Sequence, residues 1–590
     1  MMLIDPGFAG CFAEARIIIL PAVILILGAL ILPLLPRALR SSFFLAFPLL
    51  ALYAVWALPA EPAVSIRIMD YQLIVFQVDP LSRVFGSIFS LIVFIGGVYA
   101  FHLRDTGQQS AALLYAAGAL GVTFAGDYLT LFIFWEMMAV ASTFLVWARR
   151  TPESGRAGMR YLLVHVFGGG LLFTGILLYY VQSGSLLMEK FLPNDSIASW
   201  FILAGVALSA AVPPLHAWLT DAYPKATVTG AVFMSALTTK TAVYMLIRLF
   251  PGWEILLYFG VAMALYGVVF AVLANDIREI LAYHIVSQVG YMVAGVGIGT
   301  EMALNGATAH AFSHILYKAL LFMGAGAVLQ TTGKSKLTEL GGLAKAQPLT
   351  LWLYMIGAFS ISGFPLFNGF ISKSMVVAAA GEAHYGWVVL LLQLAMVGTF
   401  LHTGLKLPYF TWYAQDRGIT PGKTPRNMLI GMALAAFLCL LYGIMPSLLY
   451  RILPFPVHYQ PYTLPHLVET VQILIFTFVG FWILKTKLAG EPTITLDTDW
   501  FYRRPAPLAR RYIVDVVDTV FSAAETFASG LVRRLAIFRH NPAAIFSRDA
   551  RQKPFDPDEY RPAMQFLIIM VLLIFIVLVA SGLFLSGNFR

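Results

Sequence analysis

The chain has 590 residues, of which 59% are hydrophobic and only 12% are charged, whereas soluble domains carry roughly 25% charged residues. So few charges cannot cover a water-exposed surface, and the mean hydropathy of +0.79 excludes a soluble multidomain protein and predicts an all-α polytopic membrane protein. Two cysteines, Cys11 and Cys439, are too few for a disulfide scaffold. The net charge of +9 does not indicate nucleic acid, because the basic residues gather in short loops between apolar runs.

Apolar runs of about 20 residues, the length needed to span a bilayer, recur along most of the chain. We identify sixteen candidates, so about 15–16 transmembrane helices are expected. In chain order they are 17–36, 41–59, 80–101, 111–126, 128–148, 160–182, 199–222, 226–249, 255–274, 279–299, 303–330, 348–382, 384–408, 427–448, 467–485 and 563–586. These runs are too long and too continuous for barrel strands.

Basic residues in four loops predict the orientation of the chain. Arg37 and Arg40 follow the first span, and three later loops, at 149–160, 334–345 and 417–426, carry further basic clusters. An even number of predicted helices separates these loops, so all four are expected on one side of the membrane. That side is expected to be cytoplasmic, with both termini outside.

Two predicted helices are interrupted by proline, which removes a backbone donor. The seventh is broken at Val212–His216 and the twelfth at Ser362–Pro365. Broken helices at matching positions in two halves of a chain indicate inverted repeats around a transport site. Ordinary proline kinks, which membrane helices tolerate, are the alternative.

Ionisable side chains inside the predicted spans are the main functional signal, because a charge within lipid is costly. Low dielectric destabilises their charged forms, so such groups can be loaded and unloaded with protons near neutral pH. Three of them share one face of the eleventh helix through four-residue spacing. The six candidates for a proton relay are Glu136, Lys240, His310, His314, Lys318 and Lys373.

Further polar residues in the spans are accessory candidates. His216 lies at the first helix break and His284 near the start of the tenth helix, where it is either functional or a satisfied core histidine. Lys406 lies near the end of the thirteenth helix, where we expect its side chain to extend to the membrane interface.

A zinc site is the competing interpretation of the eleventh helix. The spacing of His310 and His314 suits a metal, but that face carries neither a cysteine nor a carboxylate, and Lys318 would repel a cation. The near-match to a phosphate-binding loop at 418–424 has the wrong glycine spacing. We therefore expect no metal and no cofactor on this chain.

Residues 486–561 form the one long polar region of the sequence. Within it, apolar residues recur at three- and four-residue steps over 505–539, which predicts an amphipathic helix. Its expected place is the membrane interface or a groove across neighbouring helices. A linker to the final span is the alternative.

Five motifs in order resemble one family. They are Phe134–Glu136, Pro214–Ala222, Asp276–Gly290, His310–Phe322 and Gly363–Lys373. Together they resemble the antiporter-like subunits shared by complex I, membrane-bound hydrogenases and Mrp-type Na⁺/H⁺ antiporters. The resemblance covers about residues 80–450, and the stretch 283–291 is most similar to the D-type subunits of the Mrp antiporters.

The resemblance implies a fold of two inverted five-helix repeats with broken helices 7 and 12. N-terminal helices precede the two repeats. Further core helices, the polar segment with its amphipathic helix, and a final span follow them. The corresponding ranges are 1–110, then 111–250 and 251–410 for the two repeats, then 411–485, 486–561 and 562–590.

The resemblance also implies roles for the buried charges. Glu136 corresponds to the helix-5 glutamate that faces a neighbouring subunit, Lys240 to the helix-8 relay lysine, and Lys373 to the helix-12 lysine at the exit. The central relay would consist of His310, His314 and Lys318.

Two departures from the family pattern stand out. Ser209 occupies the helix-7 position where the family usually has a lysine that pairs with the helix-5 glutamate. Glu136 therefore lacks its expected partner, so either Lys240 or a neighbouring subunit replaces it, or the proton path differs. The second departure is the C-terminal extension, which resembles, at shorter length, the lateral helix and last span of the largest antiporter-like subunit of complex I.

The family implies a transport subunit in the prokaryotic inner membrane that catalyses no reaction itself. Its partners would be other membrane subunits, with protons and, as a second ion, Na⁺ as cargo. Mrp-type cation/proton antiport is the leading expectation. A redox-driven proton-pump module, a bicarbonate- or CO₂-uptake partner, and a scaffold that has lost transport stay open, the last because of Ser209.

Overall fold

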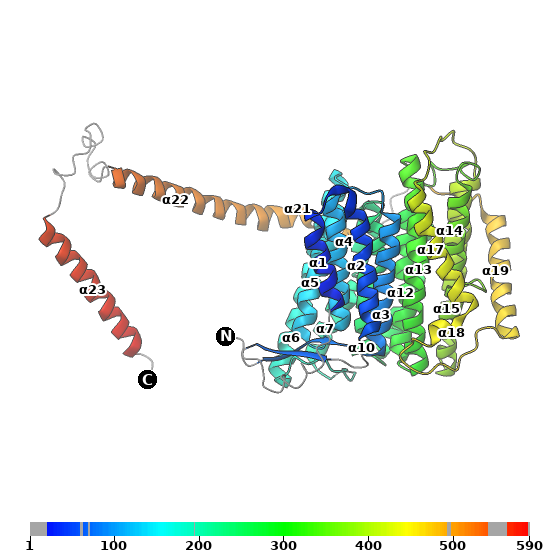
Figure 1. The fold of residues 1–590 in the computed structure, drawn as a ribbon, viewed down its shortest axis with the longest axis horizontal. Helices are drawn as coiled ribbons and strands as arrows, with labels where there is room; N and C mark the ends of the chain where they lie inside the picture. The colour runs from blue at the N-terminus through cyan, green and yellow to red at the C-terminus, as the bar shows by residue number, and fades with distance from the viewer. Residues whose placement is uncertain are drawn as a thin grey trace. The chain divides into compact units, whose positions relative to one another are not determined.

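The structure is a computed structural model that describes residues 20–58, 63–68, 71–193, 195–491, 497–540 and 563–587. It divides into two units, one that ends at Asp499 and one that begins at Trp500. Figure 1 shows both, with labels on the elements. The prediction of helix at 17–19 lies outside the described residues.

The first unit is a bundle of helices that run between its two ends (Figure 1). Its first half contains α1 (Pro21–Ile31), η2 (Leu32–Leu34), α2 (Arg37–Ala57), α3 (Pro80–Tyr99), α4 (Thr106–Phe124), α5 (Tyr128–Trp147), α6 (Pro152–Ser183), α7 (Ile197–Ser209), α8 (Ala217–Ala222), η3 (Tyr223–Lys225), α9 (Gly230–Ala236) and α10 (Thr238–Leu249). Its second half contains α11 (Glu254–Leu273), α12 (Ile277–Ile298), α13 (Glu301–Thr332), α14 (Pro348–Ser362), α15 (Asn368–Glu382), α16 (Gly386–Thr399), η4 (Phe400–Lys406), η5 (Tyr409–Tyr413), α17 (Arg426–Ile444), α18 (Pro446–Tyr450) and α19 (Leu464–Leu484).

Each of the sixteen predicted spans contains helix among the described residues. Within the described ranges, eleven helices are long and apolar enough to cross a membrane, and four shorter apolar helices accompany them. Both predicted breaks are confirmed: α7 and α8 are separated around Pro213 and Pro214, and α14 and α15 are separated around Pro365. The thirteenth predicted span continues from α16 into the π-helical turns η4 and η5.

Burial divides the helices of the first unit into inner and outer ones. The span formed by α9 and α10 and the helix α12 are entirely buried, and α13 is 94% buried. By contrast α19 is only 22% buried. Helices enclosed by protein can carry polar residues that lipid would exclude, and the inner helices are the ones that carry Lys240, His284 and the histidines of α13.

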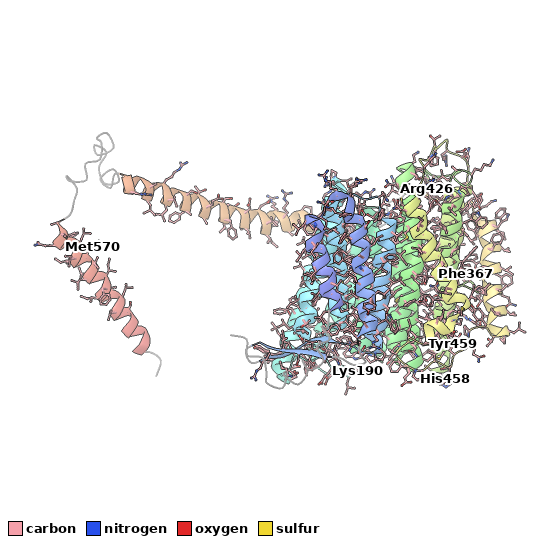
Figure 2. The ribbon with its side chains drawn as sticks, viewed as in Figure 1. Lys190, Phe367, Arg426, His458, Tyr459 and Met570 are labelled. Carbon is pink, nitrogen blue, oxygen red and sulfur yellow. The ribbon has the colours of Figure 1, made fainter. Side chains whose placement is uncertain are left out.

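The basic loops lie at one end of the bundle, as predicted. Six contacts join successive connections at that end: Arg40 with Thr106, Arg150 with Asp105, Arg149 with Pro224, Arg278 with Tyr223, Asp276 with Ser335, and Gly422 with Thr331. Figure 2 shows Arg426 at this end and Lys190 and His458 at the other. We call the end that carries these basic loops and Arg426 the basic-loop face.

A β-hairpin at the opposite end was not predicted. Strands β1 (Ala63–Ile68) and β2 (Tyr71–Gln77) pair in antiparallel fashion, with an irregularity between Val64 and Ser65. Gly126 donates its backbone N–H to Ile74 O at 2.9 Å, which ties the hairpin to the start of α5. Because the hairpin lies in a connection between spans, hydropathy gave no signal for it.

The second unit contains the C-terminal helices. They are α20 (Trp500–Arg503), α21 (Ala506–Ala509), the π-helical η6 (Arg510–Val514), α22 (Asp515–His540) and α23 (Met564–Gly587). The predicted amphipathic segment is thus helical from Ala506 onward. Its apolar residues, among them Val516, Val520 and Phe521, are exposed within the unit.

Candidate functional site

Glu136 lies in α5 with its side chain half-buried against α6. Its Oε1 atom has no hydrogen-bond partner in the part of the chain that the structure describes, and a Cβ placed on Gly169 would lie only 1.8 Å from that oxygen. Gly169 therefore makes room for the carboxylate. Among the described residues no hydrogen bond or ion pair joins Glu136 to Lys240.

Lys240 lies at the start of α10, fully buried. Its Nζ atom donates to Ser235 O at 2.5 Å and to Thr239 Oγ1 at 3.0 Å. The span is irregular at Leu237, whose ψ is −70°, and this irregularity separates α9 from α10 just before the lysine. Lys240 thus has neutral oxygen partners and no paired carboxylate among the described residues.

The polar face of α13 is confirmed as one continuous row. His310 Nδ1 lies 3.0 Å from Ser372 Oγ of α15, and His310 Nε2 lies 3.4 Å from the Tyr317 hydroxyl. The rings of His310 and His314 are 6.2 Å apart. His314 and Lys318 are fully buried, and their side-chain nitrogens have no hydrogen-bond partner among the described residues.

Lys373 of α15 adjoins this row from the second helix break. Its Nζ atom donates to Ile361 O at 2.5 Å and lies 5.1 Å from the centre of the Tyr291 ring. Ile361 lies in the last turn of α14, so the lysine bonds to a carbonyl beside the break.

Electrostatic interactions join these groups into one neighbourhood. The positive charge of Lys240 interacts with His314 and with Lys318. Lys373 interacts electrostatically with the same two residues. Lys373 also acts on His310. We call Lys240, His310, His314, Lys318 and Lys373 the buried polar axis. The structure brings these five predicted residues together and leaves Glu136 apart, at the edge of the bundle.

Two accessory candidates extend the axis. The His284 ring lies 5.5 Å from that of His402, which lies in η4, and all four ring nitrogens lack hydrogen-bond partners among the described residues. The expectation that Lys406 extends to the interface is wrong, because its residue is 1% exposed and its Nζ donates to Val272 O at 2.7 Å. The carbonyl at the end of α11 holds this lysine inside.

The other two accessory candidates lie around the first helix break. Ser209 is the last residue of α7, and its buried hydroxyl has no hydrogen-bond partner among the described residues. His216 precedes α8 and is fully buried, with its Nε2 atom 3.2 Å from Asp497 Oδ1. Tyr266 and Tyr283 also donate to the Asp497 carboxylate, at 2.6 and 2.7 Å.

The Asp497 carboxyl lies after α19, outside the spans. Burial raises its pKa, but the interaction with His216 and the hydrogen bonds from Tyr266 and Tyr283 outweigh burial and hold the pKa well below its usual range. Asp497 is therefore an ionised carboxylate inside a protein interior. Sequence analysis missed it because it lies in a polar region far from its partners in sequence.

Two buried histidines were also missed. His165 of α6 lies 4.5 Å, between ring centres, from Trp218 and 4.3 Å from Tyr161, and its Nε2 atom has no hydrogen-bond partner among the described residues. It precedes Gly169 by one helical turn, on the helix that packs against Glu136. The rule that selected Glu136, an ionisable group inside a span, would have found both His165 and His402.

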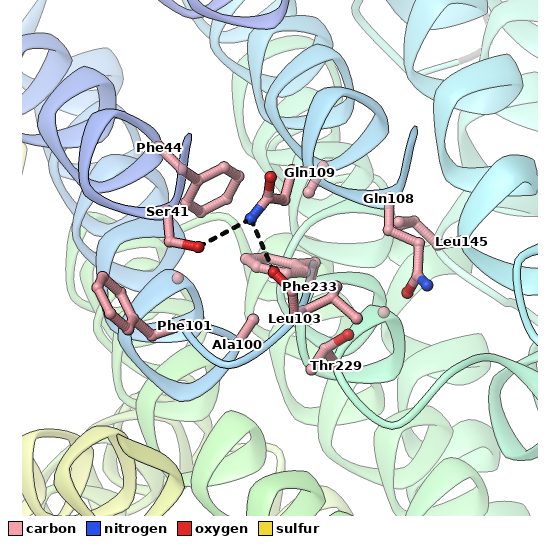
Figure 3. A pocket seen from close by; sticks show the side chains of 13 residues that line it. Ser41, Phe44, Ala100, Phe101, Leu103, Gln108, Gln109, Leu145, Thr229 and Phe233 are labelled. Carbon is pink, nitrogen blue, oxygen red and sulfur yellow. Dashed lines mark hydrogen bonds between the residues drawn. The ribbon is translucent and has the colours of Figure 1, made fainter. Parts of the chain in front are cut away.

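Among the described residues, a cavity of about 210 Å³ lies between α1, β2, α4 and α5, and two smaller cavities lie elsewhere in the bundle. One, of about 10 Å³, lies near the basic-loop face beneath Phe44 and Phe233, where Gln109 donates to Ser41 Oγ and Leu103 O at 3.3 and 3.1 Å (Figure 3). It contains no residue of the buried polar axis. Another, of about 30 Å³, is lined by Lys373 and by Glu469 of α19, which is room for about one water molecule.

A bundle with two broken helices and a row of buried lysines and histidines defines a polytopic membrane protein built for ion transfer. Residues 125–400 match the family described as "NADH:quinone oxidoreductase/Mrp antiporter, TM". The chain belongs to this family. The match lies inside the region 80–450 where the motifs indicated the resemblance.

Curated relatives agree with this assignment. The D-type subunit of the Na(+)/H(+) antiporter of Alkalihalophilus pseudofirmus is 32% identical over 320 residues, which cover 51% of this chain and 64% of that relative. The N-type subunit of the NADH-quinone oxidoreductase of Desulforudis audaxviator is 31% identical over 397 residues, which cover 60% of this chain and 78% of that relative. The chain thus spans a little under two thirds of the first relative's length.

A solved structure shares the fold over most of the chain. A chain of the membrane-bound sulfane sulfur reductase, an archaeal respiratory membrane complex, superposes with a TM-score of 0.68 at 21% identity. The superposition covers 95% of this chain and 99% of that one. At this identity the likeness shows the fold, and its coverage extends beyond the 125–400 region of the family match.

Proposed function

We propose that this chain is a proton-translocating subunit of a multisubunit membrane complex, and that its transport is Mrp-type cation/proton antiport. The buried polar axis is the observation that carries the proposal. Bases from α10, α13 and α15 interact with one another in an interior where Lys318 and His314 have no hydrogen-bond partner among the described residues. Burying such groups at this depth costs free energy unless water and exchangeable protons can reach them.

The proposed path follows the order of the axis. Protons enter near the first helix break and load Lys240, pass through ordered water and the α13 histidines, and leave by Lys318 and Lys373. The contact of His310 with Ser372 supports the last step, because it joins α13 to the helix that carries Lys373. The inverted repeats at 111–250 and 251–410 are part of the proposal, supported by the matching breaks.

Glu136 is proposed to transmit an electrostatic signal to or from a neighbouring subunit. Its half-buried position at the edge of the bundle supports this role, as does the absence of a hydrogen-bond partner for its Oε1 atom among the described residues. At about 4 Å and intermediate dielectric, one charge change is worth roughly 4 kcal/mol. That is enough to change the proton affinity of a neighbouring group substantially.

The proposed partners are other membrane subunits in a prokaryotic inner membrane, with protons and a cation such as Na⁺ as cargo. The similarity to the D-type subunit of an Na(+)/H(+) antiporter supports this choice. The chain is proposed to act as a transport subunit, without a cofactor or a reaction of its own.

A redox-driven proton-pump module is the second candidate. The similarity to the N-type subunit of an NADH-quinone oxidoreductase favours it, as does the fold shared with an archaeal respiratory complex over 95% of the chain. In that case the same axis would be driven by electron transfer in partner proteins.

Mass spectrometry of the complex that copurifies in mild detergent separates the two candidates. Small membrane subunits alone would indicate secondary antiport, and proton uptake into vesicles should then depend on the cation supplied. Iron–sulfur, hydrogenase or quinone-reducing subunits would indicate a pump module. A chain that purifies alone and carries no proton flux would contradict both candidates.

A further inference from the structure

Asp497 is a buried carboxylate that lies outside the family match. It follows α19, beyond residues 125–400, and precedes the start of the second unit at Trp500 by three residues. Its side chain is only 5% exposed, and a carboxylate loses a large hydration free energy when it is buried. Its surroundings must therefore compensate for that loss.

Three separate elements of the bundle supply this compensation. Tyr266 of α11 donates to Oδ1 at 2.6 Å, and Tyr283 of α12 donates to Oδ2 at 2.7 Å. The Thr498 backbone N–H bonds to Oδ1, and His216 Nε2 lies 3.2 Å from the same oxygen. Among the described residues, none of these partners is a lysine or an arginine. Among these partners, His216 is the basic side chain.

Charged groups of both signs lie around this cluster, and Asp221 forms ion pairs with Arg160 and Lys225. The Asp497 charge acts on Glu279 of α12, and Asp499 acts on the Tyr266 hydroxyl. Asp276 and Asp221 also act on Glu279, and Lys225 is the positive group that opposes them there.

His216 occupies the place where the cluster meets the helix break. It is fully buried, and neither ring nitrogen forms a hydrogen bond of good geometry among the described residues. Tyr283 lies in the second turn of α12, close to the α11–α12 connection, which belongs to the basic-loop face. The cluster therefore lies between that face and the break.

We propose that Asp497 is a proton-entry residue: its carboxylate and the His216 imidazole hold the proton that enters the buried polar axis from the basic-loop face. The proton comes from water, is shared between Asp497 Oδ1 and His216 Nε2, and leaves toward Lys240. Only bonds to hydrogen form and break. This inference rests on the proposed function.

The test uses the intact complex in proteoliposomes and measures the initial rate of proton transport as a function of pH. Asp497→Asn should slow transport by about 100-fold or more, within the range for loss of a proton-transfer group. The acid side of its pH–rate profile should move to lower pH by about half a unit or more, because the substitution removes the carboxylate with which the proton is shared. Asp497→Glu should restore most of the rate.

Three further variants control the result. Glu491→Gln removes a negative charge from an exposed residue of the same segment and should behave as wild type. Tyr283→Phe removes one hydrogen bond to the carboxylate and should shift the profile in the same direction by less, which keeps the inference testable if Asp497→Asn does not assemble. In a His216→Gln background, Asp497→Asn should add no further loss.

A wild-type rate and an unshifted profile in Asp497→Asn would overturn the inference while the proposed function stands. Equal losses in Asp497→Asn and Asp497→Glu with an unshifted profile would overturn it too, since they would indicate a structural role. A wild-type complex that transports no protons would instead refute the proposed function, and this inference with it.

Discussion

The two halves of the first unit hold their buried polar groups in different ways. Around Lys240 in the first half, hydroxyl groups bond to one another: Tyr115 lies 2.6 Å from Thr238 Oγ1, and Tyr161 lies 2.8 Å from Ser142 Oγ. In the first half, His216 is the fully buried histidine or lysine that has no hydrogen-bond partner at any side-chain nitrogen among the described residues. In the second half, four side chains meet this description. They are His284, His314, Lys318 and His402.

This difference indicates a division of labour. Hydroxyl groups carry no exchangeable charge near neutral pH. The hydrogen-bonded hydroxyls around Lys240 therefore fix the geometry of the helices and do not carry protons. Bases without partners can take up protons when water reaches them. We infer that the first half positions one lysine and one edge carboxylate, while the second half stores and passes protons. Each of the following substitutions tests one side of this comparison.

Among the three substitutions that test this comparison, the largest effect is expected for Lys318→Ala, in the second half. The lysine forms no hydrogen bond to lose among the described residues, so the complex should assemble, while transport should fall by about 100-fold because a proton carrier is removed. Proton uptake into vesicles measures the loss. Lys345→Ala, in a loop at the basic-loop face, is the matched control and should retain the wild-type rate. Normal transport by Lys318→Ala would contradict the inference that the second half stores protons.

An intermediate effect is expected for Gly169→Ala, which tests the edge of the first half. The added methyl group would collide with Glu136 Oε1 and displace the carboxylate. Since a displacement of about 1 Å can be costly for a functional group, we expect transport to fall by about tenfold. Gly170→Ala is the matched control, because nothing lies within 4 Å of its added carbon. Equal rates in the two variants would show that the position of Glu136 does not matter.

The smallest effect is expected for Ser372→Ala. It removes the 3.0 Å contact with His310 Nδ1, a neutral hydrogen bond worth about 1 kcal/mol. Transport should slow by about threefold to fivefold, with no loss of the assembled complex on native gels. A loss as large as that of Lys318→Ala would mean that this hydroxyl carries protons itself, and the division between hydroxyls and bases would then be wrong.

Hydropathy was sufficient to locate the helices, because a bilayer requires long apolar segments whatever their packing. It was also sufficient for the helix breaks, since proline acts locally. It could not reveal the hairpin at β1 and β2, which lies between spans, or the π-helical turn η4, which has no sequence signal of its own. These features depend on contacts and register that one sequence does not display.

Local sequence patterns likewise predicted one part of the site, while contacts between distant residues determined the rest. The four-residue spacing of His310, His314 and Lys318 was enough to place them on one face, and the structure confirms it. The burial of Lys406 depends on a carbonyl 134 positions away, so the rule that lysines near helix ends reach the interface gave the wrong result. Asp497 is 214 positions from Tyr283, and no local pattern could have predicted that contact.

The most direct test of the account is proton flux through Lys240. The purified complex would be reconstituted as wild type and as Lys240→Ala, with subunit composition checked by native mass spectrometry and flux followed with an internal pH dye. The account predicts flux in the wild type and a rate at the liposome background in Lys240→Ala, from a complex of unchanged composition. Equal flux from the two complexes would show that protons do not cross by the buried polar axis.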